Sequence, residues 1–181
     1  MSESSPSGGL RNPELLGIYC NDHLASAMGG IELVSRMLGE HRGTPDEQRL
    51  EELLDQLREE RASLTAMTRA LGLPIRSYKQ AAAWVAEKLA RGKLNGRLLS
   101  RSPLSSLVEF EFIANAVLIK RAGFETLREL AEVEPRLDKA ELERLIHQAD
   151  SQHDWLVRSR RRVAADLFGG RPEPASEVAE T

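Results

Sequence analysis

The chain has 181 residues, of which 41% are hydrophobic and 29% charged, and its formal net charge is −3. This length fits one domain with a buried core, and the composition excludes wholesale disorder and a fibrous repeat. The weak negative charge offers no general attraction for nucleic acid or an anionic membrane, so no specific nucleic-acid partner is expected. Because Cys20 is the only cysteine, an internal disulfide and a thiolate metal cluster are excluded, which fits a cytoplasmic location.

Both ends of the chain lack the apolar periodicity of a packed element. Residues 1–11 are rich in Ser, Gly and Pro, and residues 169–181 are rich in Gly, Pro and Glu. We therefore expect two disordered ends around a single helical domain at residues 12–168. No apolar run of about 18 residues occurs, so no transmembrane segment is expected, and the N-terminus lacks the regions of a secretory signal.

Two helices are predicted in the first part of the domain. The first begins at Asn12-Pro13-Glu14, which supplies an N-cap, a proline at the first helical position and an acid in the first turn, and it ends near residues 41–43. The second begins at Thr44, which forms a capping-box pattern with Glu47, and it ends at residues 72–74. The predicted apolar stripes are Leu15, Ile18, Tyr19, Ala25, Leu33, Val34 and Met37 on the first helix, and Leu50, Leu53, Leu54, Leu57, Leu64, Met67 and Leu71 on the second.

A connection of about 30 residues, 73–102, follows. Its first half predicts a short amphipathic helix, and residues 92–101 predict a loop. A third helix is expected from Ser102-Pro103 with a break or kink at Gly123, then a short helix over residues 124–133, and a fourth helix opened by Asp138 and Glu141. The predicted stripes are Leu104, Leu107, Val108, Ala114, Asn115 and Leu118 on the third helix, and Leu142, Leu145, Ile146, Ala149, Leu156, Val163 and Leu167 on the fourth.

Two antiparallel helical hairpins joined by one long crossover resemble the ferritin-like four-helix bundle. The resemblance covers about residues 12–168, and it is one of plan without a diagnostic motif. It implies an all-α fold with a short helix in the crossover, and, since such bundles often pair through the outer faces of their first two helices, a homodimer. In di-iron members, inward Glu residues and Glu-x-x-His pairs hold the metal.

Five residues can be compared with that metal pattern: Asp22, Glu60, Glu111, Asp150 and His153. Their positions among apolar residues predict that they face inward, and an oxygen-rich set with one imidazole suits Fe or Mn. Two features oppose an intact site. The position three after Glu60 is serine, and a rise of 1.5 Å per residue separates Asp22 from Glu111 by roughly 15 Å along the bundle. The favoured alternative is buried polar groups paired with Arg61, Asn115 or the backbone.

Two other features admit a structural and a functional interpretation. Gly29-Gly30 interrupts the first helix, which favours close helix approach over room for a ligand. The crossover holds a basic surface with an aromatic residue, suited to anionic membranes or acidic partners, although pairing with nearby acids is the favoured interpretation. This surface consists of Lys79, Trp84, Lys88, Arg91, Lys93, Arg97 and Arg101.

The sequence therefore predicts a cytoplasmic, ferritin-like bundle without an intact di-iron centre or another cofactor, acting in binding or as a scaffold rather than as an enzyme. Two alternatives stay open. One is an Fe- or Mn-binding protein with oxidase or peroxide-related chemistry, and the other is a module that docks to a partner or an anionic membrane through the basic crossover. The sequence does not identify a physiological partner.

Overall fold

A computed structural model describes residues 10–76 and 103–169. These residues form four α-helices and no strand: α1 (Pro13–Glu40), α2 (Glu47–Ala70), α4 (Pro103–Leu130) and α5 (Lys139–Phe168). The all-α prediction is confirmed for this part of the chain. The predicted short helix of the crossover, its basic surface and nearly all of the predicted disordered ends lie outside the described residues.

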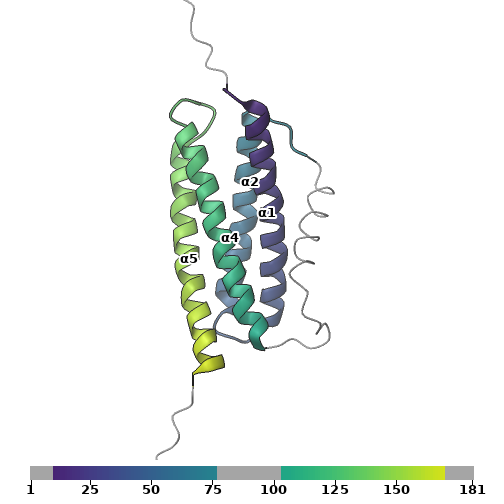
Figure 1. Cartoon of the computed structure of the whole chain (residues 1–181), viewed down its shortest axis with the longest axis vertical. Helices are drawn as coiled ribbons and strands as arrows, with labels where there is room; N and C mark the ends of the chain where they lie inside the picture. The colour runs from purple at the N-terminus through teal and green to yellow at the C-terminus, as the bar shows by residue number, and fades with distance from the viewer. Residues whose placement is uncertain (1–9, 77–102, 170–181) are drawn as a thin grey trace, which may run out of the picture.

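The helices pack side by side as a bundle (Figure 1). Helix α1 packs against α2 and α4, and α4 packs most extensively against α5. Helices α1 and α2 run antiparallel, and so do α4 and α5 (Figure 1). Helices α2 and α4 run in the same direction, so the end of α2 and the beginning of α4 lie at opposite ends of the bundle. No described helix combines the length and hydropathy that a membrane crossing requires.

Short polar signals place several of the helix ends. Asp138 caps α5, since its carboxylate accepts hydrogen bonds from the backbone N–H groups of Ala140 and Glu141 at 2.9 and 3.1 Å. Helix α2 ends at Gly72, whose φ of 72° is the left-handed conformation that glycine adopts without strain. At the beginning of α2 the pattern differs from the predicted box, because Glu47 accepts from the N–H of Gly43 at 2.7 Å.

The apolar stripes predicted for α1, α2 and α5 are largely confirmed. Every stripe residue of α2 is buried, and so are the central residues of α5, whereas Leu15 at the start of α1 is exposed. The stripe predicted for α4 is wrong in phase, since Leu104, Val108, Asn115 and Leu118 are exposed. The residues of α4 that are buried are Leu107, Phe110, Ile113, Ala114, Val117, Phe124 and Leu127.

Gly123 does not break the third helix, because α4 continues to Leu130. Its function is steric. A Cβ atom at Gly123 would lie 2.6 Å from Cε1 of His23 on α1, so the absence of a side chain there makes room for the imidazole. The predicted separate helix over residues 124–133 is therefore the last part of α4.

Candidate functional site

Two apolar clusters fill the bundle, and polar side chains separate them. One cluster includes Leu57 and Val117, and the other includes Leu64 and Phe124. Glu60 lies between the two leucines on α2, and Lys120 lies between Val117 and Phe124 on α4. The helical spacing that buries the apolar neighbours therefore also directs Glu60 and Lys120 into the bundle interior.

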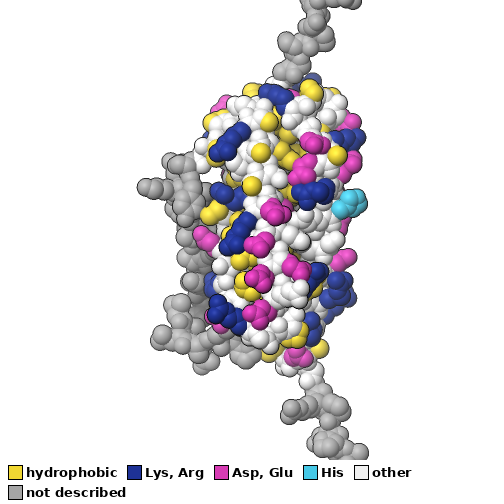
Figure 2. Space-filling model, turned by 180° about the vertical axis from the view of Figure 1, so that it is seen from behind, with side chains coloured by type: hydrophobic (Ala, Val, Ile, Leu, Met, Phe, Trp, Pro, Cys, Tyr) yellow, Lys and Arg dark blue, Asp and Glu magenta, His cyan; other side chains and the backbone are white. Residues whose placement is uncertain are grey.

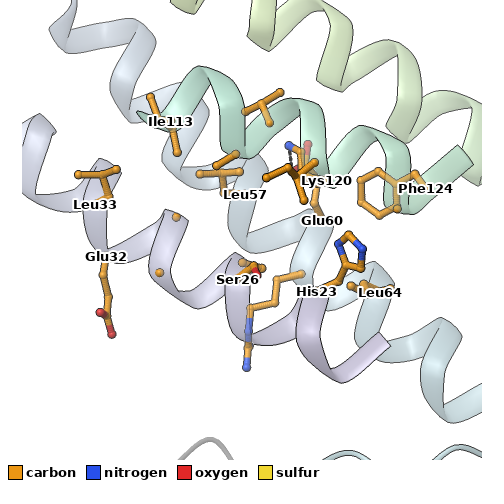
Figure 3. Close-up of a pocket in the computed structure, with 18 of the residues that line it drawn as sticks. His23, Ser26, Glu32, Leu33, Leu57, Glu60, Leu64, Ile113, Lys120 and Phe124 are labelled. Carbon is orange, nitrogen blue, oxygen red and sulfur yellow. Dashed lines mark hydrogen bonds and ion pairs between the residues drawn. The ribbon is translucent and has the colours of Figure 1, made fainter. Parts of the chain in front are cut away.

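Glu60 and Lys120 form a largely buried ion pair, in which the Lys120 side chain is 16% exposed and its Nζ donates to Glu60 Oε2 (Figure 3). Two glutamines of α5 complete it. Glu60 Oε1 accepts from Gln148 Nε2 at 3.0 Å and from Gln152 Nε2 at 2.8 Å, and Lys120 Nζ donates to Gln152 Oε1 at 2.5 Å. Gln152 Nε2 also donates to Gln56 Oε1 of α2 at 2.8 Å. This polar network satisfies every oxygen of the Glu60 carboxylate, as a buried charge requires.

The position of Lys120 affects its protonation. Burial lowers the pKa of Lys120, because the charged ammonium loses its hydration, while the adjacent Glu60 carboxylate opposes this shift. The ammonium and the carboxylate neutralise each other inside the bundle. Sequence reasoning identified Glu60 as inward-facing, which its exposed fraction of 2% confirms, but it expected Arg61 as a partner and missed Lys120.

A cavity of about 510 Å³ lies beside this network, between α1, α2 and α4. Its walls are mainly apolar, with Leu33, Leu57, Leu64, Ile113 and Phe124 among the lining residues. Figure 3 shows His23 and Ser26 of α1 facing the region between the helices, whereas the Glu32 carboxylate points away. Glu60 and Lys120 contribute to the lining, as do His23, Ser26, Arg36 and Arg61, so a mainly apolar wall carries several polar groups.

Polar contacts between α1 and α4 flank the cavity along its length. Tyr19 donates from its hydroxyl to Thr126 Oγ1 at 3.1 Å, and Arg36 pairs with Glu109 at 3.2 Å. Tyr19 and Arg36 both line the cavity. Phe112 and Ile119 of α4 also line the cavity, and both are exposed to solvent. Two polar contacts between α1 and α4 are therefore made by residues that line the cavity.

Gly29 and Gly30 also line this cavity. A Cβ atom added at Gly30 would meet only the tip of Ile113, at an ordinary van der Waals distance of 3.8 Å. At Gly30, close helix approach is therefore not the reason for the glycine, contrary to the favoured interpretation. The space left by its missing side chain belongs to the cavity.

His23 packs between α1 and α4 with its ring 4.6 Å from that of Tyr19. Burial lowers its pKa below the ordinary value of 6.5, and the nearby Asp22 carboxylate opposes the shift. Because the folded state then binds the proton less readily than the unfolded state, His23 contributes stability that is present above about pH 6.5 and lost as the pH falls through its folded pKa.

We expect this contribution in a comparison of the chain with its His23→Gln variant. As the pH falls from about 7.5 to about 5.5, the free energy of unfolding should decrease more steeply in the natural chain than in the variant. Urea denaturation followed by circular dichroism at each pH measures both curves. Parallel curves over this range would show that His23 does not resist protonation in the folded state.

The structure does not bring the five predicted metal ligands together. Asp22 and Glu111 are exposed, so the prediction that they face inward is wrong, and Glu111 lies 3.8 Å from Arg160. Asp150 pairs with Arg121 at 2.5 Å and is partly exposed, as is His153. Within residues 10–76 and 103–169, no three His, Cys, Asp or Glu side chains are grouped so as to hold a metal ion.

The remaining surface carries charges of both signs. On the face opposite to that of Figure 1, acidic and basic side chains are interspersed (Figure 2). Such mixing agrees with the small net charge and does not favour one sign of partner. In comparisons with family models, curated proteins and solved structures, the chain matched none of them.

Proposed function

We propose that this protein is a non-enzymatic, ferritin-like bundle that binds an apolar small molecule between α1, α2 and α4. The observation that carries the proposal is the cavity of about 510 Å³, a volume typical of small-molecule sites. Its walls are mainly apolar with a few polar groups, among them the Glu60–Lys120 pair, which is the usual composition of such a site. Support for the ferritin-like plan is the shared direction of α2 and α4 across one long connection.

Gly30 in the wall supports ligand binding over a purely structural void. A glycine within a helix costs about 0.8–1 kcal/mol relative to alanine, so its presence needs a compensating gain. At Gly30 the helices do not approach closely enough to supply that gain. Space for a bound molecule supplies it instead.

Filling the cavity should abolish binding without unfolding the bundle. We expect Gly30→Leu to weaken the binding of prodan, a neutral fluorophore, by tenfold or more, because the new side chain occupies the space of the ligand. Fluorescence titration measures the Kd, and thermal unfolding checks that the variant is folded.

Gly39→Leu is the matched control, because Gly39 lies on the same helix, is exposed and has no heavy atom within 4 Å of an added Cβ. This control should bind prodan like the natural chain. If the natural chain shows no saturable binding, or if both variants bind equally well, the cavity is not a ligand site and the proposal is wrong.

A further inference from the structure

The polar network beside the cavity has one unused donor. A lysine ammonium carries three hydrogens. Among the described residues, Lys120 Nζ has two acceptors, Glu60 Oε2 and Gln152 Oε1, which leaves the third hydrogen without an acceptor. Since Lys120 lines the cavity, a bound molecule can reach this group.

Close to Glu60, the cavity wall presents two hydrogen-bond donors that have no acceptor among the described residues. Both oxygens of Glu60 are occupied, as described above, and the side-chain oxygen of Gln152 accepts from Lys120. Arg61 also lines the cavity, and within the described part of the chain its buried Nε–H has no acceptor. A bound molecule with an acceptor at this place would satisfy such a donor, whose burial without an acceptor costs free energy.

At Lys120 itself, charge balance favours a neutral acceptor over an anionic one. The Lys120 charge is already compensated by Glu60 in direct hydrogen-bond contact. A ligand carboxylate at Lys120 would lie close to the Glu60 carboxylate in a poorly hydrated site, where a second negative charge is unfavourable. A carbonyl oxygen accepts the hydrogen without adding charge.

We infer that the cavity takes a neutral, mostly apolar molecule bearing a carbonyl oxygen, and that the third hydrogen of the Lys120 ammonium bonds to that oxygen. This inference rests on the proposed function, because it concerns the same cavity. It adds the chemical class of the ligand and the residue that orients it. Lys120 has the role of a binding residue here, and no bond of the ligand is made or broken.

Three probes of one shape test the inference: benzophenone, diphenylmethane and diphenylacetate. All three have two phenyl rings on one carbon. That carbon is a carbonyl in benzophenone and a methylene in diphenylmethane, and in diphenylacetate it bears a carboxylate. We expect benzophenone to bind the natural chain about tenfold more tightly than diphenylmethane, as one hydrogen bond to a charged donor allows, and more tightly than diphenylacetate. Competition with prodan measures each Kd.

The double variant Glu60→Gln/Lys120→Met removes the ammonium without leaving a buried unpaired carboxylate. In this variant the affinity for benzophenone should fall to that for diphenylmethane, whose own affinity should not change. The carbonyl stretch of bound, isotope-labelled benzophenone should lie at lower frequency in the natural chain than in the variant. Glu132→Gln/Lys139→Met removes an exposed ion pair elsewhere and is the control for the substitutions themselves.

The outcomes separate the two proposals. If neither prodan nor any of the three probes binds, the proposed function itself fails. If prodan binds but none of the three probes displaces it, the cavity binds ligands and the inferred ligand class is wrong. If benzophenone and diphenylmethane bind with equal affinity, or if the carbonyl frequency is the same in both proteins, the cavity binds ligands but the assignment of Lys120 is overturned. If diphenylacetate binds most tightly, the neutral class is wrong and the cavity prefers an anion.

Discussion

Replacement of Lys120 by methionine should destabilise the bundle by about 3–5 kcal/mol, the usual cost of removing one partner of a buried ion pair. Methionine retains most of the lysine's length, so the loss comes mainly from charge rather than volume. Glu60, with an exposed fraction of 2%, would keep its two glutamine donors but lose the cation with which it forms an ion pair. Urea denaturation at neutral pH measures the change in the free energy of unfolding.

Two further variants identify the cause of that loss. The double variant Glu60→Gln/Lys120→Met should recover most of the lost stability, because it leaves no buried charge. Lys139→Met removes a lysine from an exposed ion pair with Glu132 and should change stability little. If Lys120→Met alone is as stable as the natural chain, the ion pair is not a structural element of the bundle.

Phe110→Ala should also cost about 3–5 kcal/mol, because it removes a fully buried aromatic side chain and leaves a cavity. The Phe110 ring has no exposed surface and lies edge-on to Trp155 at 6.1 Å and to His41 at 5.4 Å between ring centroids. Its loss therefore opens a void among side chains from the α1–α2 connection, α4 and α5. Denaturant unfolding measures this loss as a lower midpoint, and an unchanged slope shows that the surface exposed on unfolding is the same in both proteins.

Phe112→Ala is the matched control on the same helix. Phe112 is 55% exposed, so its truncation should change stability by no more than about 0.5 kcal/mol. Since Phe112 lines the cavity, the same variant should still weaken prodan binding. Equal destabilisation by the two substitutions would show that the burial pattern described for α4 is wrong.

The contrast between buried Phe110 and exposed Phe112 also explains why the buried face predicted for α4 is wrong. Helix α4 carries apolar residues on most of its circumference, including Val108, Phe112 and Ile119, which are exposed. Hydrophobic periodicity then has no single phase, and the stripe predicted from it points to the wrong face. With the correct phase, set by Ile113, Val117 and Phe124, Lys120 falls in the buried stripe.

The candidate site was predictable only in part for the same reason. Glu60 interrupts a clean leucine stripe on α2, so its burial follows from local spacing. Its partner, in contrast, comes from a helix 60 residues further along the chain. The nearer Arg61 was the natural candidate, but successive residues of a helix point in different directions, so the two side chains do not face the same neighbours.

By itself, the sequence determined the all-helical class and most of the helix ends, because caps, glycines and apolar periodicity act over a few residues. It also determined the buried faces of α2 and α5, where polar residues occupy the other side. Only the tertiary structure decided which face of α4 is buried, why residue 123 must be glycine, and that Glu60 pairs with Lys120 beside a cavity. These features depend on how helices distant in sequence approach one another, which local periodicity does not specify.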